Sequence, residues 1–180
     1  MSVFLYIASA APLGEYQNPH HKLISVNEAL ALGMEGIPDH MLAPRFDRDA
    51  PGVMLWSDAP IKIEIIDGRA IVDDGGFDDD FVIFPVEKMA DFLTEKEFCS
   101  CLELSYTEGR ANRLIEYLRE QLEYTDEVEL WHLWLSDDFT ERTRTTKIPA
   151  DELTARDIKE LLDIDVWQEP RTHYCLTICR

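Results

Sequence analysis

The residues with the clearest chemical potential are four cysteines and a histidine. Cys99 and Cys101 stand in the segment FCSCLELS, with one residue between them. Cys175 and Cys179 lie with His173 in the segment HYCLTICR. Thiolates and imidazoles are zinc ligands, and paired thiols can also carry redox chemistry. These five side chains therefore form a candidate zinc or thiol site, with inert packing as the other interpretation.

The spacing of the cysteines favours packing over metal binding. Both segments alternate in polarity, which predicts β-strands and places Cys99 and Cys101 on one face. Residues two apart on a strand lie about 6.5 to 7 Å apart, so one extended strand chelates zinc poorly without a turn or bulge. Free cysteines are also among the most buried residue types. A zinc or thiol site would require the two cysteine strands to be neighbours in the sheet.

A second candidate set consists of aspartates. Most of them surround two glycines in the segment DDGGFDDDF, residues 73–81. Carboxylates on a turn can hold Ca²⁺ or Mg²⁺, but this spacing does not match an EF-hand loop, and Asp and Gly are the usual turn formers. As an acidic surface for a protein partner, the candidate residues are Asp73, Asp74, Asp78, Asp79, Asp80, Asp137 and Asp138.

The remaining motifs favour a protein without catalytic activity, although they do not decide the question. His40 beside Asp39 is a weak signal for a general base. His132, between two tryptophans, is expected to be a packed and hydrogen-bonded core residue. The sequence contains no G-x-S-x-G, G-x-x-x-x-G-K-[ST] or G-x-G-x-x-G pattern and no H-E-x-x-H metal motif.

The charge limits the partners. The 180 residues include 17 Lys and Arg against 36 Asp and Glu, a net charge of −19. Such a charge repels nucleic acids and anionic lipids and favours a basic protein partner. The four cysteines and the absence of a convincing export signal or apolar span long enough for a membrane predict a cytoplasmic protein.

Polarity patterns predict the elements that position these residues. Helices are expected at 25–34, where a capping box begins with Ser25, and at 86–93, 107–122 and 154–162. Asp67-Gly68 predicts a tight hairpin turn, and the proline-rich stretch 36–52 a long loop. Strands are expected at 2–10, 61–66, 69–74, 81–84, 98–106, 127–136, 142–148 and 173–180.

These elements together predict one α+β domain spanning 1–180, a mixed and mostly antiparallel sheet with helices packed against it. The segment 127–136 is apolar on both faces, which is typical of a central strand. The segment 142–148 is expected to be its antiparallel neighbour, with an exposed basic face.

The opening SVFLYIAS, the C-x-C segment at Cys99 and Cys101, and the segments NRLIEYLREQL and EVELWHLWLSDD resemble a family of uncharacterised bacterial proteins. That family opens with an S-V-x-L-Y-I-A-S strand and carries a glycine-rich C-x-C segment in mid-chain. Ser100 and Leu102 stand here where the family has glycines. The resemblance implies a bacterial intracellular protein and brings no activity with it.

Two functions from different classes follow. The first is a non-enzymatic acidic module that binds a protein, for example an immunity-type inhibitor of a basic partner. The second is a metal or thiol protein that uses Cys99, Cys101, Cys175, Cys179 and His173. The sequence does not determine the oligomeric state.

Overall fold

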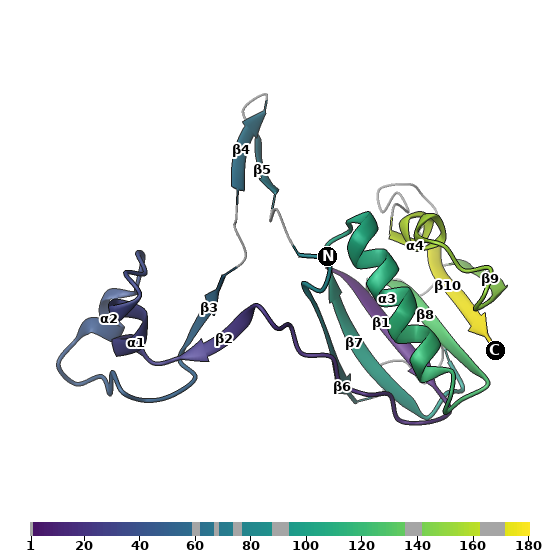
Figure 1. Cartoon of the computed structure of the whole chain (residues 1–180), viewed down its shortest axis with the longest axis horizontal. Helices are drawn as coiled ribbons and strands as arrows, with labels where there is room; N and C mark the ends of the chain where they lie inside the picture. Colours follow the sequence, from purple (N-terminus) through teal and green to yellow (C-terminus); the bar gives the residue numbers. More distant parts are fainter. Residues whose placement is uncertain are drawn as a thin grey trace. The chain divides into compact units, whose positions relative to one another are not determined.

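A computed structural model describes residues 2–58, 62–66, 69–73, 77–87, 94–135, 142–162 and 172–180 (Figure 1). The chain divides into two compact units. The larger unit comprises Met1–Asn18 and Phe77–Arg180, and the inserted unit is Pro19–Gly76. The inserted unit thus interrupts the larger one in sequence. That residues 1–180 form one domain stays a prediction.

The larger unit is built on a six-stranded sheet with the strand order β6-β7-β1-β8-β10-β9. Every neighbouring pair is antiparallel except β10 with β9, which is parallel. The class is therefore α+β with a mixed, mostly antiparallel sheet, as predicted. The strands are β1 (Ser2–Ser9), β6 (Phe81–Val86), β7 (Phe98–Leu104), β8 (Glu127–Leu135), β9 (Arg142–Pro149) and β10 (Thr172–Cys179).

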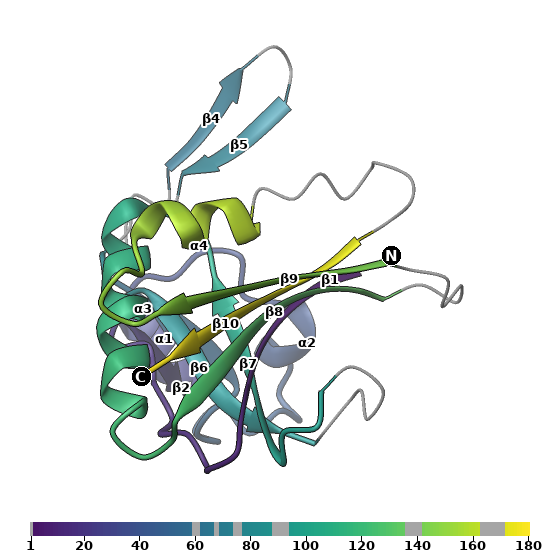
Figure 2. The same ribbon diagram turned by 90° about the vertical axis from the view of Figure 1, so that its right-hand side faces the viewer.

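Two helices, α3 (Glu108–Gln121) and α4 (Ala155–Leu162), cover one face of this sheet (Figures 1 and 2). The Thr107 side chain accepts a hydrogen bond from the Arg110 amide and caps α3, which corresponds to the helix predicted at 107–122. Both helices turn apolar side chains inward. The residues that fill the core between helices and sheet include Ile7, Phe81, Ile83, Leu102, Leu114, Leu118, Leu130, Ile158, Leu161, Leu176 and Ile178.

The position of β8 confirms the prediction of a central strand. It lies between β1 and β10, and both of its faces are buried, with Leu130 on the helix-covered side and Trp131 on the other. A strand with no exposed face requires apolar residues at consecutive positions. The nearly continuous apolar run of this segment follows from that requirement.

The prediction for the segment 142–148 was wrong in its pairing. It forms β9, which pairs in parallel with β10 and not antiparallel with β8. Parallel neighbours need a crossover connection, and α4 lies between β9 and β10 in the chain. A second correction concerns Pro85, which was expected to end β6. The strand continues to Val86, and proline is tolerated because β6 is an edge strand.

The described residues of the inserted unit form two short β-ribbons and two short helices. The Ser25 capping box is present: Ser25 accepts from the Glu28 amide, and Glu28 accepts from the Ser25 amide. The helix it begins ends earlier than predicted, and the loop 36–52 contains one helical turn. The elements are β2 (His21–Ile24), α1 (Val26–Ala31), α2 (Asp39–Leu42), β3 (Met54–Ser57), β4 (Lys62–Ile66) and β5 (Arg69–Asp73).

The pairing of β4 with β5, in which Ile66 lies opposite Arg69, confirms the predicted hairpin. Its turn residues Asp67 and Gly68 lie outside the described residues, as do residues 88–93 of the predicted helix. Strands β2 and β3 were not predicted. Among the described residues, no helix is both long enough and apolar enough to cross a membrane.

Candidate functional site

The cysteines lie on the sheet face opposite α3 and α4, which we call the second face. The strand register joins one row of side chains across it. In strand order, this row is Phe84, Cys101, Tyr6, Trp131, Cys175 and Thr145. Alternation along the strands therefore predicted correctly that the cysteines of each strand share a face.

The sheet order nevertheless keeps the two cysteine strands apart. Strands β1 and β8 lie between β7 and β10, and Tyr6 and Trp131 stand in the row between Cys101 and Cys175. Three strand spacings amount to about 14 Å, too far for one metal ion to join both strands. Among the described residues, no group of three or more His, Cys, Asp and Glu side chains is placed to hold a metal.

The environments of two thiols also disfavour thiolate chemistry. Burial raises the pKa of Cys175 to about 12, and its side chain packs with Tyr6, Ala8, Trp131 and Leu133. Burial, reinforced by the charge of Glu103, also raises the pKa of Cys101. The thiolate is the reactive form of cysteine, so a raised pKa disfavours redox chemistry at both side chains. At neutral pH both side chains are protonated and act as packing residues.

Charged groups line the end of the second face. The Lys96 and Lys147 ammonium groups donate to the two oxygens of the Glu127 carboxylate, at 2.6 and 2.9 Å. The Glu129 carboxylate accepts from the Trp131 indole at 2.8 Å and from the Thr94 hydroxyl at 2.7 Å. The segment around residues 94–96 is thereby tied to the sheet.

The structure describes three side chains of the predicted acidic set, those of Asp78, Asp79 and Asp80. The Asp80 carboxylate accepts from the fully buried Arg110 guanidinium at 2.8 Å and from the Asn18 side chain. Asp78 is exposed, and its carboxylate occupies the space that a side chain at Gly109 would fill. Asp79 is half-buried. The Asp73 side chain and residues Asp74, Asp137 and Asp138 lie outside what the structure describes.

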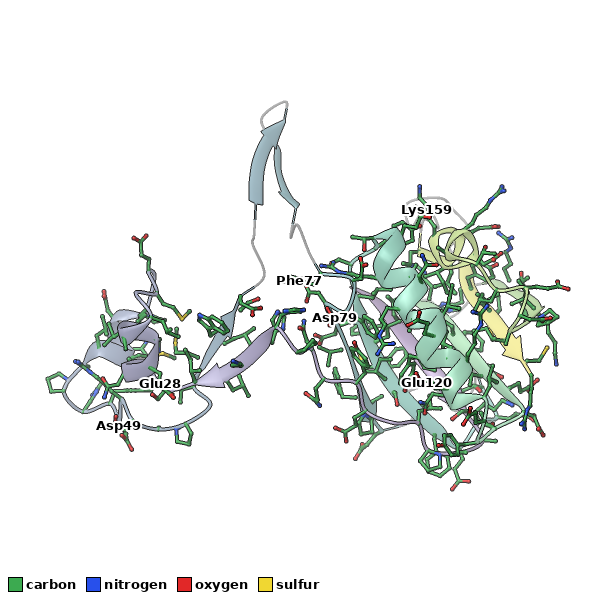
Figure 3. The ribbon with its side chains drawn as sticks, viewed as in Figure 1. Glu28, Asp49, Phe77, Asp79, Glu120 and Lys159 are labelled. Carbon is green, nitrogen blue, oxygen red and sulfur yellow. The ribbon has the colours of Figure 1, made fainter. Side chains whose placement is uncertain are left out.

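Arg110 binds the segment on which the chain re-enters the larger unit, and Asp80 links that segment to Asn18, where the chain leaves. Its guanidinium donates to the carbonyls of Phe77 and Ser105, at 3.1 and 3.2 Å, as well as to Asp80. Figure 3 labels Phe77 and Asp79 on this returning segment. Asp80 therefore serves the fold and is not available to a partner. Arg110, Asp80 and Asn18 are called the Arg110 cluster below.

His132 departs from its prediction in one respect. It is a core residue, 3% exposed, but its buried Nδ1 has no hydrogen-bond partner among the described residues. The ring is among the residues that line a cavity of about 610 Å³, whose lining also includes Leu102 of the helix-covered face and Cys101 of the second face. The sequence carried one signal that was not followed, since His132 is the only polar residue between Leu130 and Leu135.

His40 and His20 belong to the inserted unit and make contacts within it. His40 is exposed on α2, and its ring meets Phe46 edge to face at 6.5 Å. His20 lies within hydrogen-bond distance of the Asp58 carboxylate, with Nδ1 and Oδ1 3.0 Å apart. A general-base role for His40 stays a prediction.

Comparison with known proteins gives no indication of the function. No family model, no curated protein and no solved structure matches this chain.

Proposed function

We propose that the protein is a non-enzymatic cytoplasmic module that binds a basic protein through the outward face of α3. The surface consists of Glu108, Glu116, Glu120, Glu123 and Tyr124, and we call it the α3 surface. All five side chains are exposed. Figure 3 labels Glu120 on α3.

The observation that carries this proposal is that basic side chains of the larger unit bind carboxylates and carbonyls of the same unit. Lys96 and Lys147 bind Glu127, Arg144 binds Glu160, and Arg119 donates to the carbonyl of Ala150. On the α3 surface itself, Arg113 binds Glu116 at 2.8 Å, so the remaining carboxylates of that surface contribute most of its charge. The excess of acidic residues thus falls on outward positions such as those of α3. An exposed surface of one sign steers an oppositely charged partner toward it.

Tyr124 adds an anchor to this acidic surface. It is 74% exposed directly after Glu123. Tyrosine is enriched among the residues that carry most of the binding energy at protein interfaces. An exposed tyrosine among carboxylates suits a partner with a basic patch and an apolar pocket, such as the cationic site of an enzyme or toxin. The same charge disfavours nucleic acid.

The proposal is tested by affinity purification with the full chain and two variants of equal net charge. In the first, Glu116, Glu120 and Glu123 become Gln. In the matched control, the exposed Glu87, Glu97 and Glu152 become Gln.

We expect a basic protein to be retained by the wild type and the control and lost by the first variant. With the purified partner, Tyr124→Ala should weaken binding at least tenfold in calorimetry, and raising the salt should weaken it further. Equal retention by the two triple variants would refute the assignment to α3.

A further inference from the structure

Strand β9 forms one edge of the six-stranded sheet, and among the described residues its one strand partner is β10. The register pairs consecutive residues from Arg142 with Thr172 to Pro149 with Cys179, without a bulge. Figure 1 shows β9 beside β10 at the border of the sheet. The outer side of β9 therefore presents backbone amides and carbonyls that no described strand pairs with.

The hydrogen bonds of the sheet identify these outward groups. The Ala150 amide, directly after β9, donates to the Cys179 carbonyl of β10 at 2.8 Å. Successive residues of a strand turn their amides and carbonyls to opposite sides, so the even-numbered residues of β9 face β10. Thr143, Thr145 and Lys147 turn their amides and carbonyls outward.

The other edge of the sheet is covered, whereas the edge at β9 is not. At β6, Tyr16 exchanges two backbone hydrogen bonds with Ile83, and Pro85 interrupts the row of amides. In β9 the one proline is Pro149, the last residue of the strand. Covering segments, internal prolines and bulges are common ways of closing a sheet edge. The edge of β9 is thus open to another strand along most of its length.

Strand β9 is basic, although the protein as a whole is acidic. It contains Arg142, Arg144 and Lys147 and no carboxylate, in a chain with a net charge of −19. The Arg144 side chain is 52% exposed and that of Lys147 is 60% exposed. At physiological salt, charges act over about 8 Å. A segment that lies along β9 therefore responds to these cations more than to distant carboxylates.

Each of the two carboxylates that bind Arg144 and Lys147 has a second cation near it. Glu127 also binds Lys96. Glu160 on α4 has Arg156 one helical turn before it. Arg156 is exposed and makes no ion pair within the part of the chain that the structure describes. In both groups the cations outnumber the carboxylates, so a carboxylate on an added strand finds a cation to bind.

We infer that β9 accepts an extended acidic segment of a partner protein as an additional strand of the sheet. The segment bonds the outward amides and carbonyls of Thr143, Thr145 and Lys147, and its carboxylates bind the cations beside β9. In strand addition, main-chain hydrogen bonds provide affinity and side chains provide selectivity. A second copy of β9 is disfavoured as the occupant, because it would bring like charges to the same edge. The inference does not depend on the α3 surface, which binds a partner of opposite charge.

Two peptides of equal length test the inference with the full chain. One alternates Glu with Val and the other alternates Lys with Val, and each is titrated while the backbone amide signals are followed by NMR. We expect the Glu peptide to shift the amide signals of Thr143, Thr145 and Lys147 and to slow their hydrogen exchange. The Lys peptide should bind at β9 at least tenfold more weakly, because it meets like charges there.

Two variants at one position test the backbone contribution. Thr145→Pro removes an outward amide and keeps the ladder with β10, so it should fold, as edge strands with proline do. It should bind the Glu peptide at least tenfold more weakly, because a hydrogen bond is lost and the ring obstructs the edge. Thr145→Val keeps the amide and should bind as the wild type does.

A charge variant tests the selectivity. Arg156→Gln removes a cation beside β9 and should weaken binding of the Glu peptide about threefold, an effect that added salt reduces. Arg45→Gln, at an exposed position of the inserted unit, is the matched control and should bind as the wild type does.

The inference is overturned if the Glu peptide leaves the three outward amides of the wild type unchanged, or if both peptides protect them equally. It is also overturned if folded Thr145→Pro binds as well as Thr145→Val. Protection of these amides that rises with protein concentration without peptide would assign the edge to a second copy of the chain instead. If Thr145→Pro does not fold, the two peptides and Arg156→Gln still decide the question.

Discussion

Single side chains of the second face owe their protonation to their neighbours. Cys175 is held protonated by burial, whereas Glu127 is held ionised by two ammonium groups. The hydrogen bonds from Lys96 and Lys147 lower the pKa of Glu127 to about 2. The same face thus stabilises a neutral thiol in its apolar centre and a carboxylate at its charged end.

Because of Glu127, the free energy of unfolding of the larger unit depends on pH in the acidic range. Its carboxylate stays ionised in the folded state down to a pH of about 2, while in the unfolded chain it takes up a proton near its ordinary value of 4.5. The unfolded state therefore gains the proton first, and the free energy of unfolding falls as pH drops from 4.5 toward 2. Above this window the contribution is fully present.

We expect Glu127→Gln to lower the free energy of unfolding by about 1 kcal/mol at pH 7, the usual size for partly exposed ion pairs. The difference from the wild type should shrink at pH 3. Urea denaturation at both pH values measures it. Glu123→Gln, which changes an exposed carboxylate, is the control, and a difference that stays the same at pH 3 would contradict the expectation.

At the scale of elements, the Arg110 cluster connects α3 to the chain segments on both sides of the inserted unit. Arg110 is 0% exposed and donates to the Asp80 carboxylate and to the carbonyls of Phe77 and Ser105. A buried charge needs such a complete set of partners to be tolerated.

Arg110→Met should lower the free energy of unfolding by roughly 3 to 5 kcal/mol, because it leaves the largely buried Asp80 carboxylate, 11% exposed, without its cation. Adding Asp80→Leu to this variant should recover part of the loss, since the unpaired charge is then removed. Chemical denaturation of the wild type, the two single variants and the double variant gives the coupling. A loss below about 1 kcal/mol for Arg110→Met would mean that the cluster is dispensable.

Sequence patterns predicted these elements correctly where the structure depends on residues that are close together in the sequence. Alternation located β7, β8 and β10 and the faces of their residues, and Thr107 and Ser25 marked helix starts through their own side chains. Strand order is not local, so nothing in the cysteine segments revealed that β1 and β8 separate them. Neither could the sequence reveal that Asp80 pairs with an arginine 30 positions away.

The cavity lined by His132 was hidden for a related reason. Its apolar neighbours predicted burial correctly, but whether a buried ring finds a hydrogen bond depends on side chains from other strands and helices. The cavity arises where α4 ends at Leu162, beside strands that are distant in sequence. Only the assembled sheet brings these residues together.

At the scale of the whole molecule, the segments of the larger unit that precede and follow the insertion pair with each other. Tyr16 and Ile83 exchange two backbone hydrogen bonds of 2.9 Å, so the outgoing and returning segments pair with each other. Asn18 also bonds Asp80. The larger unit therefore holds both ends of the inserted unit by contacts of its own.

A chain in which a short Gly-Ser linker replaces residues 19–76 should fold. We expect a cooperative urea transition with a free energy of unfolding within about 1 kcal/mol of that of the larger unit in the full chain, since no contact of the Arg110 cluster is removed. Circular dichroism during denaturation measures the transition. A chain without a cooperative transition would show that the insertion is needed for folding.

The central place of β1 has a consequence for synthesis on the ribosome. Its two partners, β7 and β8, begin at Phe98 and Glu127. Both edges of β1 therefore have no strand partner while about a hundred further residues are synthesised. Unpaired apolar strand edges are templates for aggregation. The nascent larger unit therefore completes its sheet late, and in the cell its yield depends on how well β1 is shielded during that interval.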